Sequence, residues 1–246
     1  MFSQNYVIQL LLSLVASLIA LSVHEFSHAY AAYRLGDPTA KSMGRLSINP
    51  IKHLDPIGTL CMVFFHFGWA RPVPIDPRYF KKPRKYFAIT ALAGPLSNIL
   101  LGFLIAPLYL LCANFFVYTD NTFLNNLMVN TLIFLYTFHV VNIGLGVFNL
   151  IPLPPFDGSR IVNVLLPQKW YFKIMKYERY IYFGVIGWLL VGDYIYKALL
   201  MINFVSSNAF LSGAARILSL SALISDAISF MSDIIIKFWQ LIPLLG

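Results

Sequence analysis

The chain has 246 residues, of which 59% are hydrophobic and 11% are charged, and its mean hydropathy is +0.71. Soluble domains carry roughly 45–50% apolar and about 25% charged residues, and a single core cannot hide this much apolar surface. The same composition excludes disorder, and two cysteines are too few for a secreted disulfide scaffold. What remains is a membrane protein with several spans.

The net charge of +8 is unevenly distributed along the chain. Ten of the 18 basic residues lie between Arg34 and Lys85, and five more lie between Arg160 and Arg179. In an apolar chain, such clusters mark cytoplasmic loops rather than a nucleic-acid interface. They therefore predict a multi-pass protein of the cell membrane, with both basic loops in the cytoplasm, the N-terminus outside and no nucleic-acid partner.

Four hydrophobic stretches are long enough to cross a bilayer as helices, which predicts an all-α polytopic membrane protein. They run from about Tyr6 to Tyr33, Tyr86 to Cys112, Leu127 to Ile151, and onward from Tyr180. Asp193 and Lys197 fall four residues apart in the last of these stretches, a spacing that predicts an ion pair on one helix face.

The connection between the first two spans contains two segments of different character. Lys41–Asn49 alternates between apolar and polar residues, which predicts a short strand. Ile57–Trp69 is apolar, but thirteen residues are too few to cross easily, so a re-entrant or interfacial segment is expected. At the other end of the chain, Ser212–Leu245 is apolar with one polar helix face, and it could span the membrane, lie in its interface or pack on a partner.

The sequence HEFSH in the first span is the strongest chemical signal. His24 and His28 are four residues apart on a helix, so both imidazoles lie on one face and can bind one zinc ion. The carboxylate of Glu25 can then accept a proton from water that the metal activates. Ionisable groups inside a span are costly and usually functional, although the alternative is a packed interface of hydrogen-bonded histidines.

A catalytic zinc ion typically has a third protein ligand, and Asp157 is the best candidate. Asp157 follows the third span at its cytoplasmic end, and the histidines lie near the cytoplasmic end of the first, so the topology brings the three residues to one side of the bilayer. His53 is the other candidate, since it could reach the zinc or shape the loop that carries it.

Three motifs together resemble the site-2 protease family of intramembrane zinc metalloproteases. They are HEFSH at His24–His28, AGPLSN at Ala93–Asn98 and NLIPLPPFDG at Asn149–Gly158. The family commonly has Leu before the Asp-Gly pair, where this chain has Phe156, which keeps the apolar character. The resemblance implies that His24, His28 and Asp157 bind one Zn²⁺ per chain and that Glu25 is the catalytic base.

Two amides near the spans, Asn98 and Asn149, have two interpretations. Each could form a helix–helix hydrogen bond, or bind the substrate backbone or the developing oxyanion. The family resemblance favours substrate binding for both residues.

The resemblance implies an endopeptidase that hydrolyses peptide bonds in or near the transmembrane segments of membrane-protein substrates. The predicted organisation is a metalloprotease core at residues 1–160, similar to minimal members without PDZ or CBS domains, followed by additional helices at 161–246. The alternative is a metal-binding membrane protein without peptidase activity, such as a zinc carrier or an inactive scaffold.

Overall fold

The computed structural model of the chain describes residues 4–65, 68–202, 206–217 and 219–245. This part is nearly all helical, and its only strand-like pairing is an isolated antiparallel bridge between Leu54 and Ala70. The helices and 3-10 turns in chain order are α1 (Gln4–Arg34), α2 (Thr39–Ser42), η1 (Pro50–Lys52), α3 (Pro56–Phe65), η2 (Pro77–Tyr79), α4 (Pro83–Asn114), α5 (Thr122–Asn149), α6 (Asp157–Leu165), α7 (Gln168–Leu200), α9 (Ala209–Arg216) and α10 (Leu220–Gln240).

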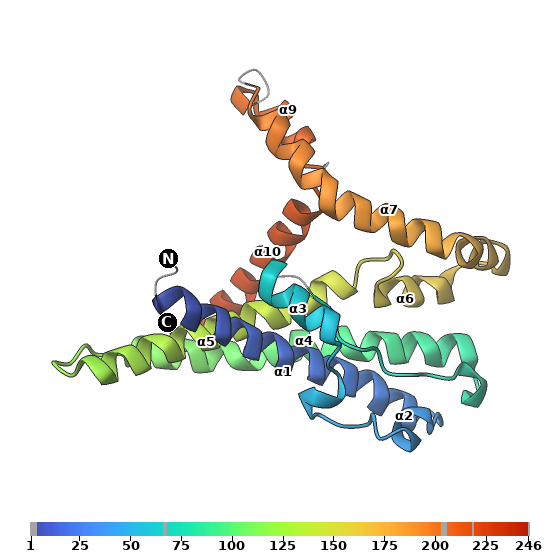
Figure 1. Cartoon of the computed structure of the whole chain (residues 1–246), viewed down its shortest axis with the longest axis horizontal. Helices are drawn as coiled ribbons and strands as arrows, with labels where there is room; N and C mark the ends of the chain where they lie inside the picture. Colours follow the sequence, from blue (N-terminus) through green and yellow to red (C-terminus); the bar gives the residue numbers. More distant parts are fainter. Residues whose placement is uncertain (1–3, 66–67, 203–205, 218, 246) are drawn as a thin grey trace.

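Helices α1, α4 and α5 run side by side and form the centre of the molecule (Figure 1). Small residues let them approach closely: Ala16 and Ala20 of α1 are fully buried against Phe138 of α5. Gly102 of α4 lies so close to Ile143 of α5 that an added Cβ would fall 2.7 Å from the Ile143 Cδ1 atom. Such close packing is typical of membrane bundles, where van der Waals contact replaces the hydrophobic effect between helices.

Four helical segments are long and apolar enough to cross a membrane, in agreement with a multi-pass membrane protein. They are Val7–Arg34, Pro83–Asn114, Thr122–Asn149 and Lys176–Leu200. The third begins earlier than the hydropathy predicts because Asn121 caps it, its side chain accepting hydrogen bonds from the N–H groups of Phe123 and Leu124.

The second basic segment was predicted as a loop, but it is mostly helical. Helices α6 and α7 cover nearly all of it and are separated around Pro167, which cannot continue a helix. Arg160 of α6 pairs with Glu178 of α7 at 2.6 Å, which ties the two helices together. The predicted ion pair between Asp193 and Lys197 is confirmed at 2.6 Å.

The strand predicted for Lys41–Asn49 is wrong. Its first two residues complete the short helix α2, and Gly44 then takes a positive φ of 66° that turns the chain. The segment has no partner strand among the described residues, so no second strand is there to form inter-strand hydrogen bonds with it. Residues 57–65 of the apolar segment Ile57–Trp69 belong to the ten-residue helix α3, residues 66 and 67 lie outside the described part, and Gly68 and Trp69 are not helical.

The C-terminal helix α10 packs on α4 and α5 of the same chain. The Trp239 indole N–H donates to the Phe103 carbonyl at 3.0 Å, and Ile235 is buried against Ala106 and Ile143. His139 of α5 bridges the Gly102 carbonyl and the Ser232 hydroxyl, at 2.9 and 2.8 Å. The tail is therefore joined to the central bundle by both apolar and polar contacts.

Candidate metal centre and groove

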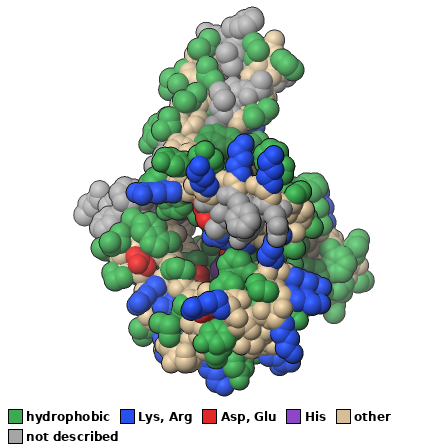
Figure 2. All heavy atoms as spheres, turned by 90° about the vertical axis from the view of Figure 1, so that its right-hand side faces the viewer, with side chains coloured by type: hydrophobic (Ala, Val, Ile, Leu, Met, Phe, Trp, Pro, Cys, Tyr) green, Lys and Arg blue, Asp and Glu red, His purple; other side chains and the backbone are tan. Residues whose placement is uncertain are grey.

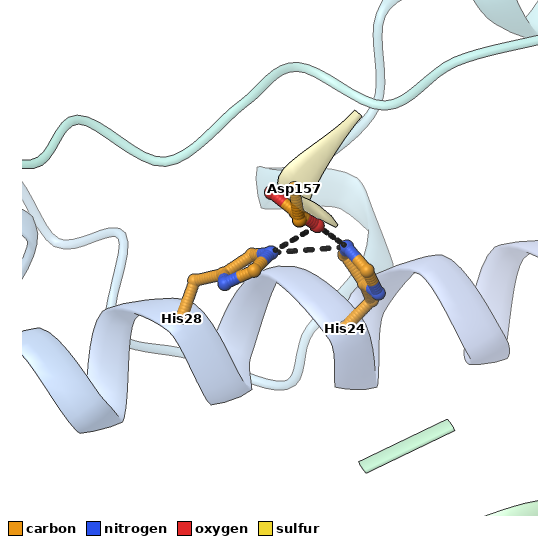
Figure 3. A group of neighbouring side chains, drawn as sticks. All are labelled: His24, His28 and Asp157. Carbon is orange, nitrogen blue, oxygen red and sulfur yellow. Dashed lines mark hydrogen bonds and ion pairs between the residues drawn. The ribbon is translucent and has the colours of Figure 1, made fainter. Parts of the chain in front are cut away.

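Three side chains from distant parts of the sequence meet at one point (Figure 3). His24 and His28 project from α1, and Asp157 projects from the first residue of α6. The two Nε2 atoms are 3.0 Å apart, and the Asp157 Oδ2 atom lies 3.1 and 3.2 Å from them. A tetrahedral zinc ion with bonds of about 2.0–2.1 Å would separate its ligand atoms by about 3.3 Å. The spacing therefore suits a zinc ion.

The hydrogen-bond partners of the imidazoles also fit a cation. His24 Nδ1 lies 2.6 Å from Asn98 Oδ1, and His28 Nδ1 lies 2.8 Å from the Thr90 carbonyl oxygen. Both partners are acceptors, so both Nδ1 atoms carry the hydrogen and both Nε2 atoms present lone pairs. Two lone pairs and a carboxylate oxygen that face one another repel unless a cation binds between them.

Asp157 reaches the histidines because the chain turns tightly after α5. A Cβ on Gly158 would overlap the carbonyl groups of Leu150 and Ile151, so only glycine fits where α6 folds back on the end of α5. Phe156 is buried and contacts the Phe148 ring, with centroids 4.4 Å apart. The aromatic residue before the Asp-Gly pair thus anchors the turn that presents the carboxylate.

Gly94 of α4 makes room for the two imidazoles. An added Cβ would lie 2.8 Å from His24 Cε1 and 2.5 Å from His28 Cε1, and closer still to His28 Nε2. Helix α4 can therefore pass directly behind the histidines only with glycine at this position.

Glu25 is held by a loop far away in the sequence. Its Oε2 atom accepts the Val73 N–H at 2.8 Å. The buried Arg45 supports the same loop by donating from Nη2 to the Arg71 carbonyl at 2.6 Å. Burial and the neighbouring Arg71 lower the pKa of the Arg45 guanidinium, whereas Glu25 opposes them, so the two side chains interact electrostatically. No local pattern in the sequence indicates either contact.

A groove of about 440 Å³ opens beside this centre. His24, Glu25 and Asn149 line it together with apolar residues of α1, α5 and α7 and residues of the loop after α3. Figure 2 shows a hollow at the end of the molecule where Lys and Arg side chains gather, with acidic and His side chains inside it. Asn149 bonds its own helix through Nδ2 to the Leu145 carbonyl, at 3.0 Å.

The other predicted residues lie elsewhere. Asn98 is fully buried behind His24, and both of its amide hydrogens are used, by the Ala20 carbonyl and by Asn142 Oδ1. His53 is not part of the three-residue metal group; its Nε2 contacts the Ser47 carbonyl at 2.6 Å, so it shapes the loop. Asn142 was not singled out from the sequence, where a lone amide in an apolar span gives no sign of its partner.

Comparison with known proteins agrees with the geometry. The sequence profile of peptidase family M50 matches residues 12–191. The chain is 40% identical over 201 residues to the candidate zinc metalloprotease YwhC of Bacillus subtilis (strain 168), covering 77% of this chain and 86% of that protein. It is 29% identical over 163 residues to the candidate zinc metalloprotease Rip2 of Mycolicibacterium smegmatis, and 28% identical over 159 residues to the zinc metalloprotease MJ0392 of Methanocaldococcus jannaschii.

These last two matches cover 63% and 64% of this chain, and 57% and 35% of the relatives. No solved structure gives a significant match. The chain belongs to peptidase family M50, the site-2 protease family. It is a metalloendopeptidase with Zn²⁺ as its cofactor, and its environment is the lipid bilayer.

Proposed function

We propose that this metalloendopeptidase cleaves peptide bonds in or near the transmembrane segments of membrane proteins. The observation that carries the proposal is the groove: it brings His24 of the candidate metal centre and the neighbouring Glu25 together with apolar walls contributed by membrane-spanning helices. An apolar groove at a water-activating site suits a substrate that arrives from the bilayer. Residues 1–160 would form the catalytic core, with α7 completing one wall of the groove.

In the proposed mechanism, His24, His28 and Asp157 hold one zinc ion. A zinc ion held by these residues would act as a Lewis acid, able to polarise a carbonyl and to lower the pKa of water. Glu25 is the general base, which accepts a proton from the attacking water and passes it to the leaving amine. The hydrogen bond from the Val73 N–H fixes the Oε2 atom of this carboxylate, so the Oε1 atom is the one that accepts and then donates the proton.

Asn149 is the proposed substrate contact among the amides. It lies on the groove wall, and its bond to the Leu145 carbonyl uses only one of its two amide hydrogens. The remaining hydrogen can be donated to the substrate backbone or to the developing oxyanion. Asn98 has no such capacity left, because its oxygen and both hydrogens have partners.

The substrate would bind in an extended form along the loop after α3. The Arg71 N–H bonds to the His53 carbonyl at 2.8 Å, so in antiparallel geometry the backbone groups of Ala70 face the opposite side. Ala70 and Pro72 both line the groove. Strand addition here would bind any sequence through its main chain. Because a transmembrane helix hides its amides, the substrate must first unwind locally.

The active site would open to the cytoplasm. Lys and Arg side chains gather around the hollow (Figure 2), and such clusters stay on the cytoplasmic side of membranes. In this orientation the loop that contains Asp120 faces outward. A membrane-impermeant maleimide should therefore label Asp120→Cys on intact cells, and labelling only after the cells are permeabilised would contradict the orientation.

The proposal is tested by measuring zinc content and cleavage on the same preparations. Purified wild type, Glu25→Gln and Asp157→Ala are reconstituted with a single-span model substrate and with a soluble unfolded peptide. We expect about one zinc ion per wild-type chain, an inactive Glu25→Gln that keeps its zinc, and loss of zinc in Asp157→Ala.

Each part of the proposal fails separately. Cleavage by Glu25→Gln near the wild-type rate would remove Glu25 as the base. Full zinc content in Asp157→Ala would remove that residue from the ligand set. Cleavage of the soluble peptide alone would refute the transmembrane substrate while leaving the metal centre in place.

A further inference from the structure

We propose that Asn98 and Asn142 form a buried amide relay that orients His24 and thereby sets the zinc affinity of the site. Both are positioning residues, because neither reaches the groove. The inference rests on the proposed role of His24 as a zinc ligand. It assigns a task to Asn142, a residue on α5 whose side-chain hydrogen bonds join it to Asn98 and to the Phe138 carbonyl.

The relay is an unbroken chain of hydrogen bonds across three helices. His24 Nδ1 on α1 donates to Asn98 Oδ1 on α4, at 2.6 Å. Asn98 Nδ2 donates to the Ala20 carbonyl at 3.0 Å and to Asn142 Oδ1 on α5 at 2.9 Å. Asn142 Nδ2 in turn donates to the Phe138 carbonyl at 2.8 Å.

Two main-chain carbonyls fix the direction of every bond in this chain. A carbonyl can only accept, so the Phe138 carbonyl requires the amide nitrogen of Asn142 and turns its oxygen toward Asn98. The Ala20 carbonyl likewise requires the nitrogen of Asn98, which turns the oxygen of Asn98 toward His24. His24 must then carry its hydrogen on Nδ1 and present the Nε2 lone pair to the metal.

Burial makes the arrangement rigid. Asn98 and Asn142 are both fully buried, so a flipped amide would face a carbonyl or an N–H group without a compensating bond. The alternative orientation of either side chain is therefore strongly disfavoured. The second histidine differs, since His28 is oriented by the Thr90 main-chain carbonyl and has no side-chain partner at Nδ1. Only His24 is oriented through side chains.

Buried amides between membrane helices can also act only as interhelical adhesion. The two interpretations differ in what happens to zinc. Adhesion alone predicts that loss of Asn142 lowers stability and leaves zinc affinity unchanged. The relay predicts that zinc affinity falls as well, and that Asn142 acts only through Asn98.

The experiment is a zinc competition titration on the full chain in detergent micelles, with a chelator of known affinity. The variants are Asn98→Leu, Asn142→Leu and the double variant, each also followed by thermal unfolding. Substitutions of residues that orient a metal ligand typically weaken binding about 10–100-fold. We expect a loss in that range for Asn98→Leu, roughly a tenfold loss for Asn142→Leu, and a double variant no weaker than Asn98→Leu alone.

Ser232→Ala is the matched control. It removes another buried interhelical bond, the one that the Ser232 hydroxyl donates to His139 Nε2, without touching the relay. It should lower the unfolding temperature and leave the dissociation constant for zinc unchanged. If Asn142→Leu fails to fold, Asn142→Ala takes its place, because it removes the same bonds without adding bulk.

The outcomes separate the relay from the proposed function. Wild-type zinc affinity in a folded Asn142 variant, or additive losses in the double variant, would overturn the relay. Wild-type zinc affinity in Asp157→Ala would instead show that the proposed ligand set is wrong.

Discussion

Gly94→Ala offers a sharp test of the metal centre, because the added atom has a known position. The new Cβ would lie 2.5 Å from His28 Cε1 and closer still to His28 Nε2, so that ring would have to move by at least about 0.9 Å to reach the 3.4 Å of an ordinary contact. The metal–ligand distances of a well-formed site lie within about 0.2 Å of their standard values. We therefore expect zinc affinity to fall at least about 100-fold, roughly 2.7 kcal/mol, and proteolysis to fall with it.

The assay is the same zinc competition titration, with Gly102→Ala as control. That substitution is chemically identical, lies on the same helix, and brings its Cβ to 2.7 Å from Ile143 Cδ1, away from His24 and His28. It should lower the unfolding temperature but not zinc affinity. Zinc binding within threefold of wild type in folded Gly94→Ala would refute the reasoning, because the imidazoles would then not need the space that glycine leaves.

Three further variants test other contacts. Ala70→Pro removes one backbone N–H at the proposed docking edge and should slow cleavage by up to about tenfold without loss of zinc. The control Ala70→Ser keeps the N–H and should cleave at the wild-type rate. Equal cleavage rates for the two variants would argue against strand addition. Arg45→Met leaves the Arg71 carbonyl without its charged donor, and should slow cleavage about tenfold at constant zinc content, with the exposed Lys41→Met as control. Asp37→Ala removes the three hydrogen bonds that a buried carboxylate accepts from Thr39 and Asp76, and should lower the free energy of unfolding by roughly 3 kcal/mol. The measurement is a denaturant titration. An unchanged free energy of unfolding would show that these bonds do not stabilise the connection between α1 and α4.

The spans and the metal group could be predicted from the sequence because their signals are simple. Hydropathy over some 20 residues marks a membrane helix whatever surrounds it. A spacing of four residues places His24 and His28 on one helix face. Asp157 follows from topology, since the ends of the first and third spans lie on the same side of the bilayer. The structure indeed brings these three side chains together.

The supporting contacts could not be predicted, because they depend on tertiary packing. Val73 is 48 residues from Glu25, and Arg45 is 26 residues from the carbonyl that it holds. The sequence around Val73 or Arg45 contains no pattern that indicates which residue each will contact. The strand expected at Lys41–Asn49 failed for a related reason: alternation specifies a strand only when a second strand completes its hydrogen bonds.

The hydrogen bond between Glu25 and the Val73 N–H has a kinetic consequence. The proposed base is tied to the same loop that would receive the substrate, so a shift of this loop during docking is transmitted to the carboxylate. Substrate affinity and turnover are then not independent parameters of this enzyme. Loop substitutions should change kcat and KM together, whereas substitutions on the α7 wall should change mainly KM. A substrate that docks weakly would leave Glu25 poorly oriented, so it would be cleaved more slowly once bound. The enzyme would therefore select substrates through the rate of the chemical step as well as through binding.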